Sequence, residues 1–271
     1  MPELPEVETV VRNLRPVLVG REITGFEAAW PKVTAPTAPA TFARQVVGRA
    51  IEDVRRRGKY ILLDLDRGHV HLHLRMTGHL FVIRAGEAIP DQQIRAWFGI
   101  SGGIRLLFRD QRKFGRIGFL ADLAPLEARL GPEPLAARFT AALLAGMLAQ
   151  RRRQIKPLLM DQSFIAGLGN IYVDEALFAA GIHPQAEAET IPAGKVKALH
   201  RAIRRLLRRA IEHQGTTFSN FRFGRNESGR FREQLKVFGR EEQPCFVCGT
   251  ALAKTRVAQR GTHWCPHCQA P

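Results

Sequence analysis

All four cysteines of this 271-residue chain lie within its last 27 residues, and their spacing constrains how that segment can fold. They form two Cys-x-x-Cys pairs, Cys245 with Cys248 and Cys265 with Cys268, which are sixteen residues apart. Two such pairs together supply the tetrahedral four-thiolate ligand set of a zinc ion, and four protein ligands leave no open coordination position. The sequence therefore predicts one structural Zn²⁺ that holds a β-hairpin, with Gly261 in the region of its turn.

The overall charge of the chain predicts a polyanionic partner. The chain has 41 lysine and arginine residues against 25 aspartate and glutamate residues, a formal net charge of +16 at pH 7. A basic excess of this size points first to nucleic acid and second to an anionic membrane surface. No apolar run approaches the roughly 20 residues of a membrane span, and the first residues carry glutamates in place of the apolar stretch of a signal peptide. We therefore expect a cytoplasmic protein. A monomer is also expected, although no sequence feature indicates the oligomeric state.

The amino terminus places an amine and an acid side by side. Removal of Met1 would leave Pro2 with a free secondary amine, which can attack an electrophilic carbon and proceed to a cationic iminium. Such an amine titrates near pH ~8, so a useful fraction is unprotonated at neutral pH. Glu3 is a candidate for moving the protons. The alternative is an ordinary terminus leading into a helix. Apolar residues do follow at helical spacing: Leu4, Val7, Val11, Leu14 and Leu18.

The hydrophobic pattern changes once along the chain, and the change predicts an α+β protein. From about residue 22 to residue 120, short alternating runs at 61–65, 70–74, 104–108 and 117–120 indicate strands of a β-sandwich or barrel. The segment Gly131-Pro132-Glu133-Pro134 marks a boundary, beyond which the pattern becomes helical. Helices are predicted over residues 139–148, 172–180 and 196–213.

Three histidines lie at alternate positions of one predicted strand and therefore share one face: His69, His71 and His73. A metal site is one interpretation, although no acidic or sulfur-containing residue on that face completes a ligand set. The other interpretation is a polar face opposite a buried one, in contact with phosphate.

Several features of the helical region suit contact with phosphate. Arg151-Arg152-Arg153 is followed closely by Lys156, and a solvated basic face is the alternative for this run. The glycine-rich segment 166–170 predicts a turn that ends at an N-cap, Asn170, and backbone N–H groups at a helix start can hold a phosphate. An ordinary helical hairpin is the alternative there. Residues 216–232 form a long loop of the kind that is functional or disordered.

The helix predicted over residues 196–213 is amphipathic. Its apolar line is expected to run through Val196, Leu199, Ile203, Leu206 and Ala210. Five arginines surround the other side, and a basic solvated face is enough to explain them: Arg201, Arg204, Arg205, Arg208 and Arg209.

These motifs, in this order, give the chain a close resemblance to the bacterial formamidopyrimidine-DNA glycosylase family. The resemblance runs from Pro2 to Gln269, nearly the full length. It rests on six segments: Pro-Glu-Leu-Pro-Glu-Val-Glu at residues 2–8, Arg-Gly-Lys-Tyr at 57–60, His-Leu-Arg-Met-Thr-Gly at 73–78, Asp-Gln-Arg-Lys-Phe-Gly at 110–115, Gly-Leu-Gly-Asn-Ile-Tyr at 167–172, and Gln-Arg-Gly-Thr at 259–262.

The resemblance implies the architecture and the partners of the chain. It implies an N-terminal catalytic β-sandwich with an N-terminal helix over residues 1–131 and a helix–two-turn–helix DNA-binding domain over residues 135–215. A lesion-covering loop over residues 216–234 and a zinc-finger β-hairpin over residues 235–271 would follow. The implied partner is double-stranded DNA that contains damaged purines, in the bacterial cytoplasm at the nucleoid. The implied cofactor is one structural Zn²⁺.

The resemblance also implies a chemistry. A bifunctional glycosylase and AP lyase would excise 8-oxoguanine and formamidopyrimidines through a Schiff base on Pro2, followed by β,δ-elimination. Glu3 would be the acid/base partner and Lys59 would assist β-elimination near phosphate. Arg260 would bind the phosphates that flank the lesion and assist δ-elimination. The implied DNA contacts are His73, Gln93, Arg112, Arg151, Lys156 and Asn170. The residues implied to fill the vacated base stack are Met76, Arg112 and Phe114.

The chain departs from the usual family pattern at three positions and in one loop. Gln111 stands where proline is usual, Arg75 where glycine is usual, and Gln93 where a DNA-contacting histidine is common; residues 217–232 match least. Two alternative functions remain open at this point. One is an endonuclease VIII-like glycosylase for oxidised pyrimidines, and the other is a lesion-binding protein without catalysis.

Overall fold

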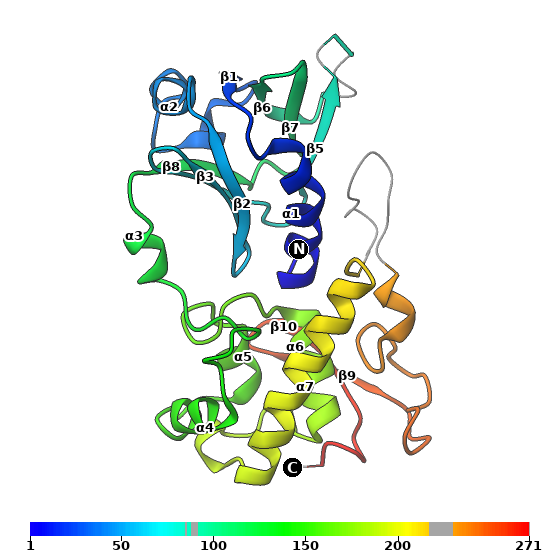
Figure 1. Ribbon diagram of the computed structural model, residues 1–271. Coiled ribbons are helices and arrows are strands. Elements are labelled where there is room, and N and C mark those ends of the chain that lie inside the picture. The colour runs from blue at the N-terminus through cyan, green and yellow to red at the C-terminus, as the bar shows by residue number, and fades with distance from the viewer. Residues whose placement is uncertain (85, 88–91, 217–229, 271) are drawn as a thin grey trace. The chain divides into compact units, whose positions relative to one another are not determined.

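The computed structural model describes residues 1–84, 86–87, 92–216 and 230–270 (Figure 1). The chain forms two compact units: Met1–Glu127 with His213–Arg230, and Ala128–Glu212 with Phe231–Pro271. The segment predicted as a lesion-covering loop is divided between these units, and its residues 217–229 lie outside the described part of the chain.

The first unit is built on two four-stranded antiparallel sheets. One sheet has the order β2-β3-β4-β8, from Ile51–Arg57, Tyr60–Leu65, His69–His73 and Arg116–Leu120. The other has the order β1-β6-β7-β5, from Ile23–Glu27, Ile94–Ile100, Ile104–Asp110 and Gly78–Arg84. Strand β6 alternates buried and half-buried side chains along its whole length, as expected where one face of a sheet meets the core. The main core takes side chains from both sheets, which confirms the predicted β-sandwich.

Helix α1 (Leu4–Leu18) closes one side of this core. Its buried stripe contains all five apolar residues that the sequence pattern singled out, and it packs against β2, β3 and β5. Pro5 lies in its first turn, where a missing N–H costs nothing. Gly20, with φ of +80°, follows the C-cap residue Val19. Helix α2 (Pro39–Val46), the short helix α3 (Ala124–Glu127) and the 3₁₀ turn η1 (Pro31–Thr34) complete the unit.

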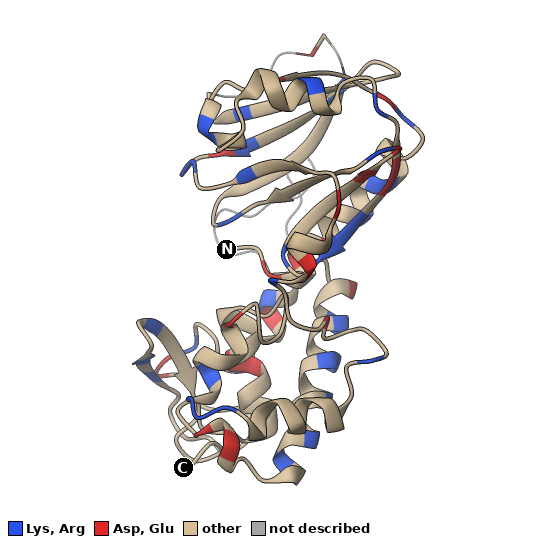
Figure 2. Cartoon of the chain, turned by 90° about the vertical axis from the view of Figure 1, so that its left-hand side faces the viewer, with Lys and Arg blue, Asp and Glu red and all other residues tan. Residues whose placement is uncertain are grey.

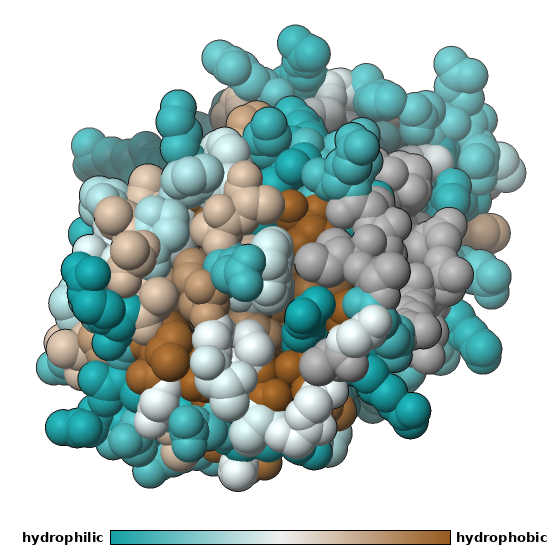
Figure 3. Space-filling view, turned by 90° about the horizontal axis from the view of Figure 1, so that it is seen from above, coloured by the Kyte–Doolittle hydropathy of each residue, from teal (hydrophilic) through white to brown (hydrophobic). Residues whose placement is uncertain are grey.

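A second, smaller apolar cluster lies on the other face of the β1-β6-β7-β5 sheet. It consists of Phe81, Ile83, Ile94 and Leu107, with Trp97 partly buried against them. Figure 3, which looks down on the molecule from above, shows apolar side chains gathered toward the middle of that view with hydrophilic ones around them.

The second unit is helical, with one β-hairpin. Its helices are α4 (Ala141–Ala149), α5 (Ile155–Met160), α6 (Asn170–Ala180) and α7 (Ala193–Glu212), with 3₁₀ turns η2 (Ala188–Thr190) and η3 (Phe231–Gln234). Helix α6 packs against α7 on one side and against β10 on another. Strands β9 (Ala253–Val257) and β10 (Arg260–Trp264) form the hairpin that the cysteine spacing predicts. The α+β architecture is therefore as expected.

Three local predictions about this unit are wrong. Gly261 lies in β10 and not in the turn, because Arg260 pairs with Val257 and leaves a two-residue loop, Ala258 and Gln259. Asn170 is the first residue of α6, and the extended Gly169 is the N-cap.

The third wrong prediction concerns Leu206, which was expected on the apolar line of α7. Leu206 is only half-buried, and Leu207 is buried in its place. Leu207 lies four residues after Ile203, on the face of α7 that packs on α6. The C-terminal end of α6 is as predicted: Gly181 adopts the left-handed conformation and stops the helix.

Within the described residues, no helix is both long enough and apolar enough to cross a membrane.

Candidate active site and metal centre

The amino terminus is held by the start of α1. Pro2 and Glu3 are buried, whereas the side chain of Met1 is 54% exposed. The Glu3 carboxylate accepts the backbone N–H of Glu6, and Glu3 N–H donates back to Glu6 Oε2 at 2.8 Å. This reciprocal capping box satisfies two of the free donors at the helix start. The capping box therefore fixes Glu3 and, with it, the backbone next to Pro2.

Glu6 has a second task that the sequence pattern did not reveal. Its Oε1 atom accepts the backbone N–H of Thr216 at 2.7 Å and the Thr216 hydroxyl at 3.2 Å. Gly215 has φ of +81°, and a Cβ at that position would lie 2.7 Å from Glu6 Oε1. Only glycine fits there. Glu6 therefore ties the base of Pro2 to the residues that directly precede segment 217–229. The glutamate three residues after Glu3 signals the capping box, but it does not signal the contact with Thr216.

Lys59 lies in the tight connection between β2 and β3, with only 4% of its surface exposed. Gly58, with φ of +56°, makes the turn. Arg56 anchors this hairpin to α1 through Glu8 Oε2 at 3.0 Å, and Arg57 pairs with Glu127 at 2.7 Å. Pro2, Glu3 and Lys59 thus belong to the same unit, on elements that pack together.

The three histidines of β4 do not form a metal site in the structure. Among the described residues, only the four cysteines make a group that could hold a metal ion. His69 Nδ1 lies 2.6 Å from Asp64 Oδ1, and the rings of His71 and His73 pack edge-on against Tyr60.

His73 is uncharged at neutral pH. Burial, with help from the charges of Arg75 and Lys59, lowers the pKa of His73 to about 3. Its Nδ1 accepts the Arg75 backbone N–H at 3.0 Å, so the ring proton is on Nε2. A DNA contact from His73 stays a prediction, and it would use this N–H and no charge. Gln93 stays a prediction too; its backbone carbonyl accepts the Asp110 N–H at 2.9 Å.

One exposed cluster consists of Met76, Arg112 and Phe114, and it is formed by two different loops. Met76 follows β4, and the other two lie between β7 and β8. Arg112 Nη1 is 3.1 Å from Met76 Sδ, and its Cζ lies 4.9 Å from the centre of the Phe114 ring. Met76 is 44% exposed and Phe114 is 47% exposed, whereas residues of these types are usually buried. An exposed apolar pair around a guanidinium marks a binding feature.

The buried carboxylate of Asp110 joins the two loops of this cluster. Its Oδ1 accepts the Thr77 hydroxyl and the Arg112 N–H, and its Oδ2 accepts the Gly115 N–H at 2.7 Å. Asp110 is 1% exposed. A Cβ at Gly115 would lie 2.3 Å from the Phe108 ring, so this position also requires glycine. In the sequence, Asp110 stands out only as part of the motif at residues 110–115, and nothing in that motif indicates this bridging role.

We predict that Asp110→Ala destabilises the first unit by about 3 kcal/mol, because it removes the acceptor of the Thr77 hydroxyl and of the Gly115 N–H and one of the two acceptors of the Arg112 N–H. Urea denaturation measures the change in free energy of unfolding. Asp122→Ala is the matched control, because the exposed Asp122 carboxylate accepts a single backbone N–H in the described part of the chain, that of Ala124. The control should lose less than about 1 kcal/mol. Equal losses in the two variants would show that Asp110 does not brace the loops.

Both loops of the cluster hold a non-glycine residue in the left-handed region, Arg75 with φ of 52° and Lys113 with φ of 60°. Glycine suits position 75 because it has no Cβ and adopts the left-handed conformation without strain. We therefore predict that Arg75→Gly raises the free energy of unfolding by about 0.5–1 kcal/mol. Arg75→Ala removes the same charge but keeps Cβ, so it should give no gain. If both variants are stabilised equally in urea, the gain comes from charge and not from backbone strain.

In the second unit, two predicted phosphate contacts hold the β9–β10 hairpin. Lys156 is fully buried; its Nζ donates to the Gly261 carbonyl at 3.0 Å and to Thr262 Oγ1 at 2.8 Å, and it pairs with Asp174 at 2.6 Å. Asn170 Nδ2 donates to the same Gly261 carbonyl at 2.9 Å. A buried ammonium requires such a partner charge. Direct phosphate contacts from Lys156 and Asn170 stay predictions, and what the structure shows is that both position the residue next to Arg260.

Arg260 itself is exposed at the start of β10, and Arg151 is exposed at the end of α4. Before Arg260, the two loop residues Ala258 and Gln259 have φ of 45° and 62°. Two positive φ values in a two-residue hairpin loop match the type I′ turn, which twists in the same sense as the strands.

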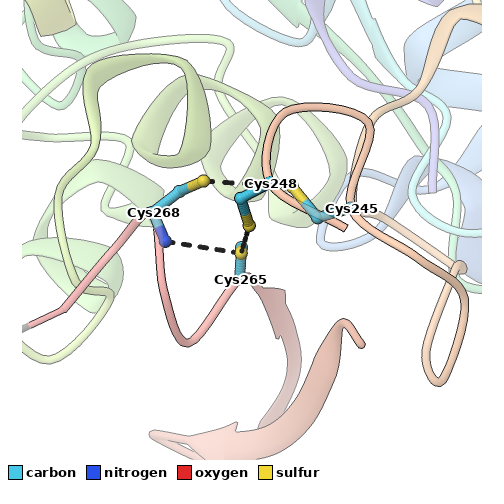
Figure 4. A group of neighbouring side chains, drawn as sticks. All are labelled: Cys245, Cys248, Cys265 and Cys268. Carbon is cyan, nitrogen blue, oxygen red and sulfur yellow. Dashed lines mark hydrogen bonds between the residues drawn. The ribbon is translucent and has the colours of Figure 1, made fainter. Parts of the chain in front are cut away.

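The four cysteines fit a zinc ion. Their sulfur atoms all lie within 4.8 Å of one another, with 3.9 Å between Cys245 and Cys268 and 3.5 Å between Cys248 and Cys265 (Figure 4). Four thiolates at about 2.3 Å from a central zinc are separated by about 3.8 Å in a regular tetrahedron. The site is a closed structural zinc site, as predicted.

Three regions of the chain match known protein families. Residues 1–117 match the formamidopyrimidine-DNA glycosylase N-terminal domain, and residues 130–222 match the H2TH domain of the same enzymes. Residues 242–271 match a zinc finger found in FPG and IleRS.

Curated relatives and solved structures match over the full length. A formamidopyrimidine-DNA glycosylase of Symbiobacterium thermophilum is 48% identical over 99% of this chain and 89% of its own length. That of Bacillus subtilis is 42% identical over 99% of both. A complex of Lactococcus lactis FPG with Fapy-dG-containing DNA matches with a TM-score of 0.91, at 34% identity over 99% of this chain and 100% of that one. MutM in complex with carbocyclic 8-oxo-G DNA gives 0.92, at 34% identity over 100% of both. The chain therefore belongs to the formamidopyrimidine-DNA glycosylase family.

Proposed function

We propose that this protein is a bifunctional DNA glycosylase and AP lyase that removes oxidised purines, 8-oxoguanine and formamidopyrimidines, from duplex DNA. The exposed Met76–Arg112–Phe114 cluster is the observation that carries this proposal. A reactive sugar carbon inside a duplex is inaccessible, so an enzyme that attacks it must extrude the nucleotide at a cost of a few kcal/mol. The cluster supplies two apolar groups to fill the gap and one guanidinium to contact the orphaned base.

Pro2 is the nucleophile in this proposal. After removal of Met1, its amine nitrogen bonds to C1′ as the C1′–N9 bond breaks, and the base leaves with the bonding electrons and takes up a proton. Loss of the amine proton and opening of the sugar ring give an iminium. β-Elimination removes a 2′ proton and expels the 3′ phosphate, δ-elimination expels the 5′ phosphate, and hydrolysis of the iminium releases Pro2.

The other residues move protons and hold the DNA backbone. Glu3, fixed by the capping box, is the acid/base partner. Lys59 assists β-elimination, and Arg260, exposed on the zinc-held hairpin, binds the flanking phosphates and assists δ-elimination. Further contacts come from His73, Gln93, Arg112, Arg151, Lys156 and Asn170. With a net charge of +16, the protein works at the nucleoid of a bacterial cytoplasm.

Borohydride trapping across a panel of lesions tests the proposal. We expect a reduced covalent adduct with 8-oxoguanine and Fapy-dG duplexes, and little adduct with oxidised-pyrimidine duplexes. Equal adduct on both classes would favour an endonuclease VIII-like enzyme. Tight binding to damaged DNA without any adduct would show a lesion-binding protein that does not catalyse.

A further inference from the structure

The outer face of α7 carries a row of four exposed arginines, of which only Arg209 has a hydrogen-bond partner in the described part of the chain, Gln234 Oε1 at 2.6 Å. Arg201, Arg205, Arg208 and Arg209 line a depression of 400 Å³ along this helix, and Glu212 is its one carboxylate among the described lining residues. Within the described part of the chain, none of Arg201, Arg205 and Arg208 forms an ion pair or hydrogen bond. Arg204 differs, because its Nη1 donates to the carbonyls of Pro134 and Ala136.

This depression continues into an apolar cavity. A cavity of 340 Å³ shares Arg205 and Arg209 with it, so the two form one groove. Its apolar walls are Leu206, the half-buried residue of α7, together with Phe231 and Phe246. Phe246 lies in the first cysteine pair and is 64% exposed. A zinc-held loop therefore presents a large aromatic side chain at the edge of this groove, where it does not pack into the core.

Cations surround the apolar part of the groove as well. Arg240 Cζ lies 3.6 Å from the centre of the Phe246 ring, and Lys236 Nζ lies 4.7 Å from it. The nearby carboxylate of Glu175 does not neutralise them. It is 2% exposed and accepts the backbone N–H groups of Lys236, Val237 and Phe238. The groove thus combines an apolar pocket with uncompensated positive charge.

The arginine row is not on the side of its unit that carries Arg260. Helix α6 packs between α7 and β10. Figure 2 shows the basic residues of α7 along one edge of the helical unit and the two-stranded sheet at the opposite edge. The arginine row is therefore separate from the hairpin that carries Arg260, and its role does not depend on that residue.

We propose that this groove docks an acidic segment of a partner protein, with an aromatic side chain in the cavity and carboxylates along the arginine row. Arg201 and Arg209 are eight residues apart on the helix, which is about 12 Å. An extended chain covers that distance in about four residues. The matching ligand is a short acidic run next to one aromatic residue, a recognition mode that relies on both charge and an apolar anchor.

Fluorescence anisotropy with a labelled synthetic peptide tests this proposal on the zinc-loaded full chain. The probe has four consecutive aspartates, one glycine and one phenylalanine, and we expect a Kd on the order of 10–100 μM at low salt. Arg205→Glu combined with Arg208→Glu should weaken binding at least about tenfold, because it reverses two of the charges that face the peptide. Phe246→Ala, or a probe with glycine in place of phenylalanine, should weaken it about fivefold.

Lys197→Glu is the matched control, because Lys197 is exposed on the same helix but lies outside the groove. This variant should bind the probe as the parent does, and all variants should still cleave damaged duplex. Equal weakening by Lys197→Glu, or equal binding of the probe without phenylalanine, would show unspecific attraction of polyanions and overturn the proposal. If undamaged duplex displaces the probe and the double arginine variant loses DNA affinity, the groove is a nucleic-acid surface instead.

Discussion

A protein that keeps any residue ahead of Pro2 is expected to lose base excision and strand cleavage by about 10³-fold or more, while it still binds damaged DNA. In a peptide bond the proline nitrogen shares its lone pair with the carbonyl and cannot act as a nucleophile. The structure also indicates that such a chain folds normally. The Met1 side chain is 54% exposed, and the Glu3–Glu6 capping box holds the start of α1 independently of what precedes Pro2.

The sharpest form of this experiment uses one preparation before and after proteolysis. A cleavable leader is placed directly ahead of Pro2, and trapping on 8-oxoguanine duplex is measured before and after its removal. Mass spectrometry of the reduced complex should place the sugar on Pro2 in the processed protein only. A protein with the same leader at its carboxyl end should be fully active. Adduct formation by the uncleaved protein would place the nucleophile elsewhere, with Lys59 as the first residue to examine.

The parts of this protein that sequence predicts well are those where one local rule decides the outcome. The spacing of Cys245, Cys248, Cys265 and Cys268 allows only one simple arrangement, and the four sulfur atoms are close together in the structure. The apolar stripe of α1 follows from the helical period alone. The strands expected over residues 61–65 and 104–108 are likewise present as β3 and β7.

The parts that sequence misses depend on contacts between distant residues. Glu6 reaches Thr216, which is 210 positions away, and no local pattern announces that hydrogen bond. By residue type alone Met76 and Phe114 would be assigned to the core. The family resemblance named them together with Arg112, and the structure adds that both are exposed and that Met76 contacts Arg112. The burial of Lys156 could not be foreseen, because its partner Asp174 comes from the next helix.

Removal of zinc is expected to open the β9–β10 hairpin and to lower cleavage of damaged DNA by about 10²-fold or more. A structural zinc contributes on the order of 10–16 kcal/mol to the folding of its site, which exceeds the total stability of many domains. The two strands of the hairpin bury few side chains of their own. Without the metal, few interactions therefore keep the hairpin folded. Its opening would separate Gly261 from Lys156 and Asn170 and would displace Arg260.

Hydrogen exchange reports this change directly. The His263 N–H, which donates to Asp174 Oδ2 at 2.9 Å, should lose its protection in a chelator, whereas β3 and β6 of the first unit should keep theirs. Cys248→Ser should reproduce the loss, and Val247→Ala in the same loop should retain zinc, because Val247 is 74% exposed and contributes no ligand. Returning Zn²⁺ should restore both protection and cleavage. If the chelated protein kept full cleavage and a protected His263 N–H, Lys156 and Asp174 would be holding the hairpin without the metal, and zinc would have no part in placing Arg260.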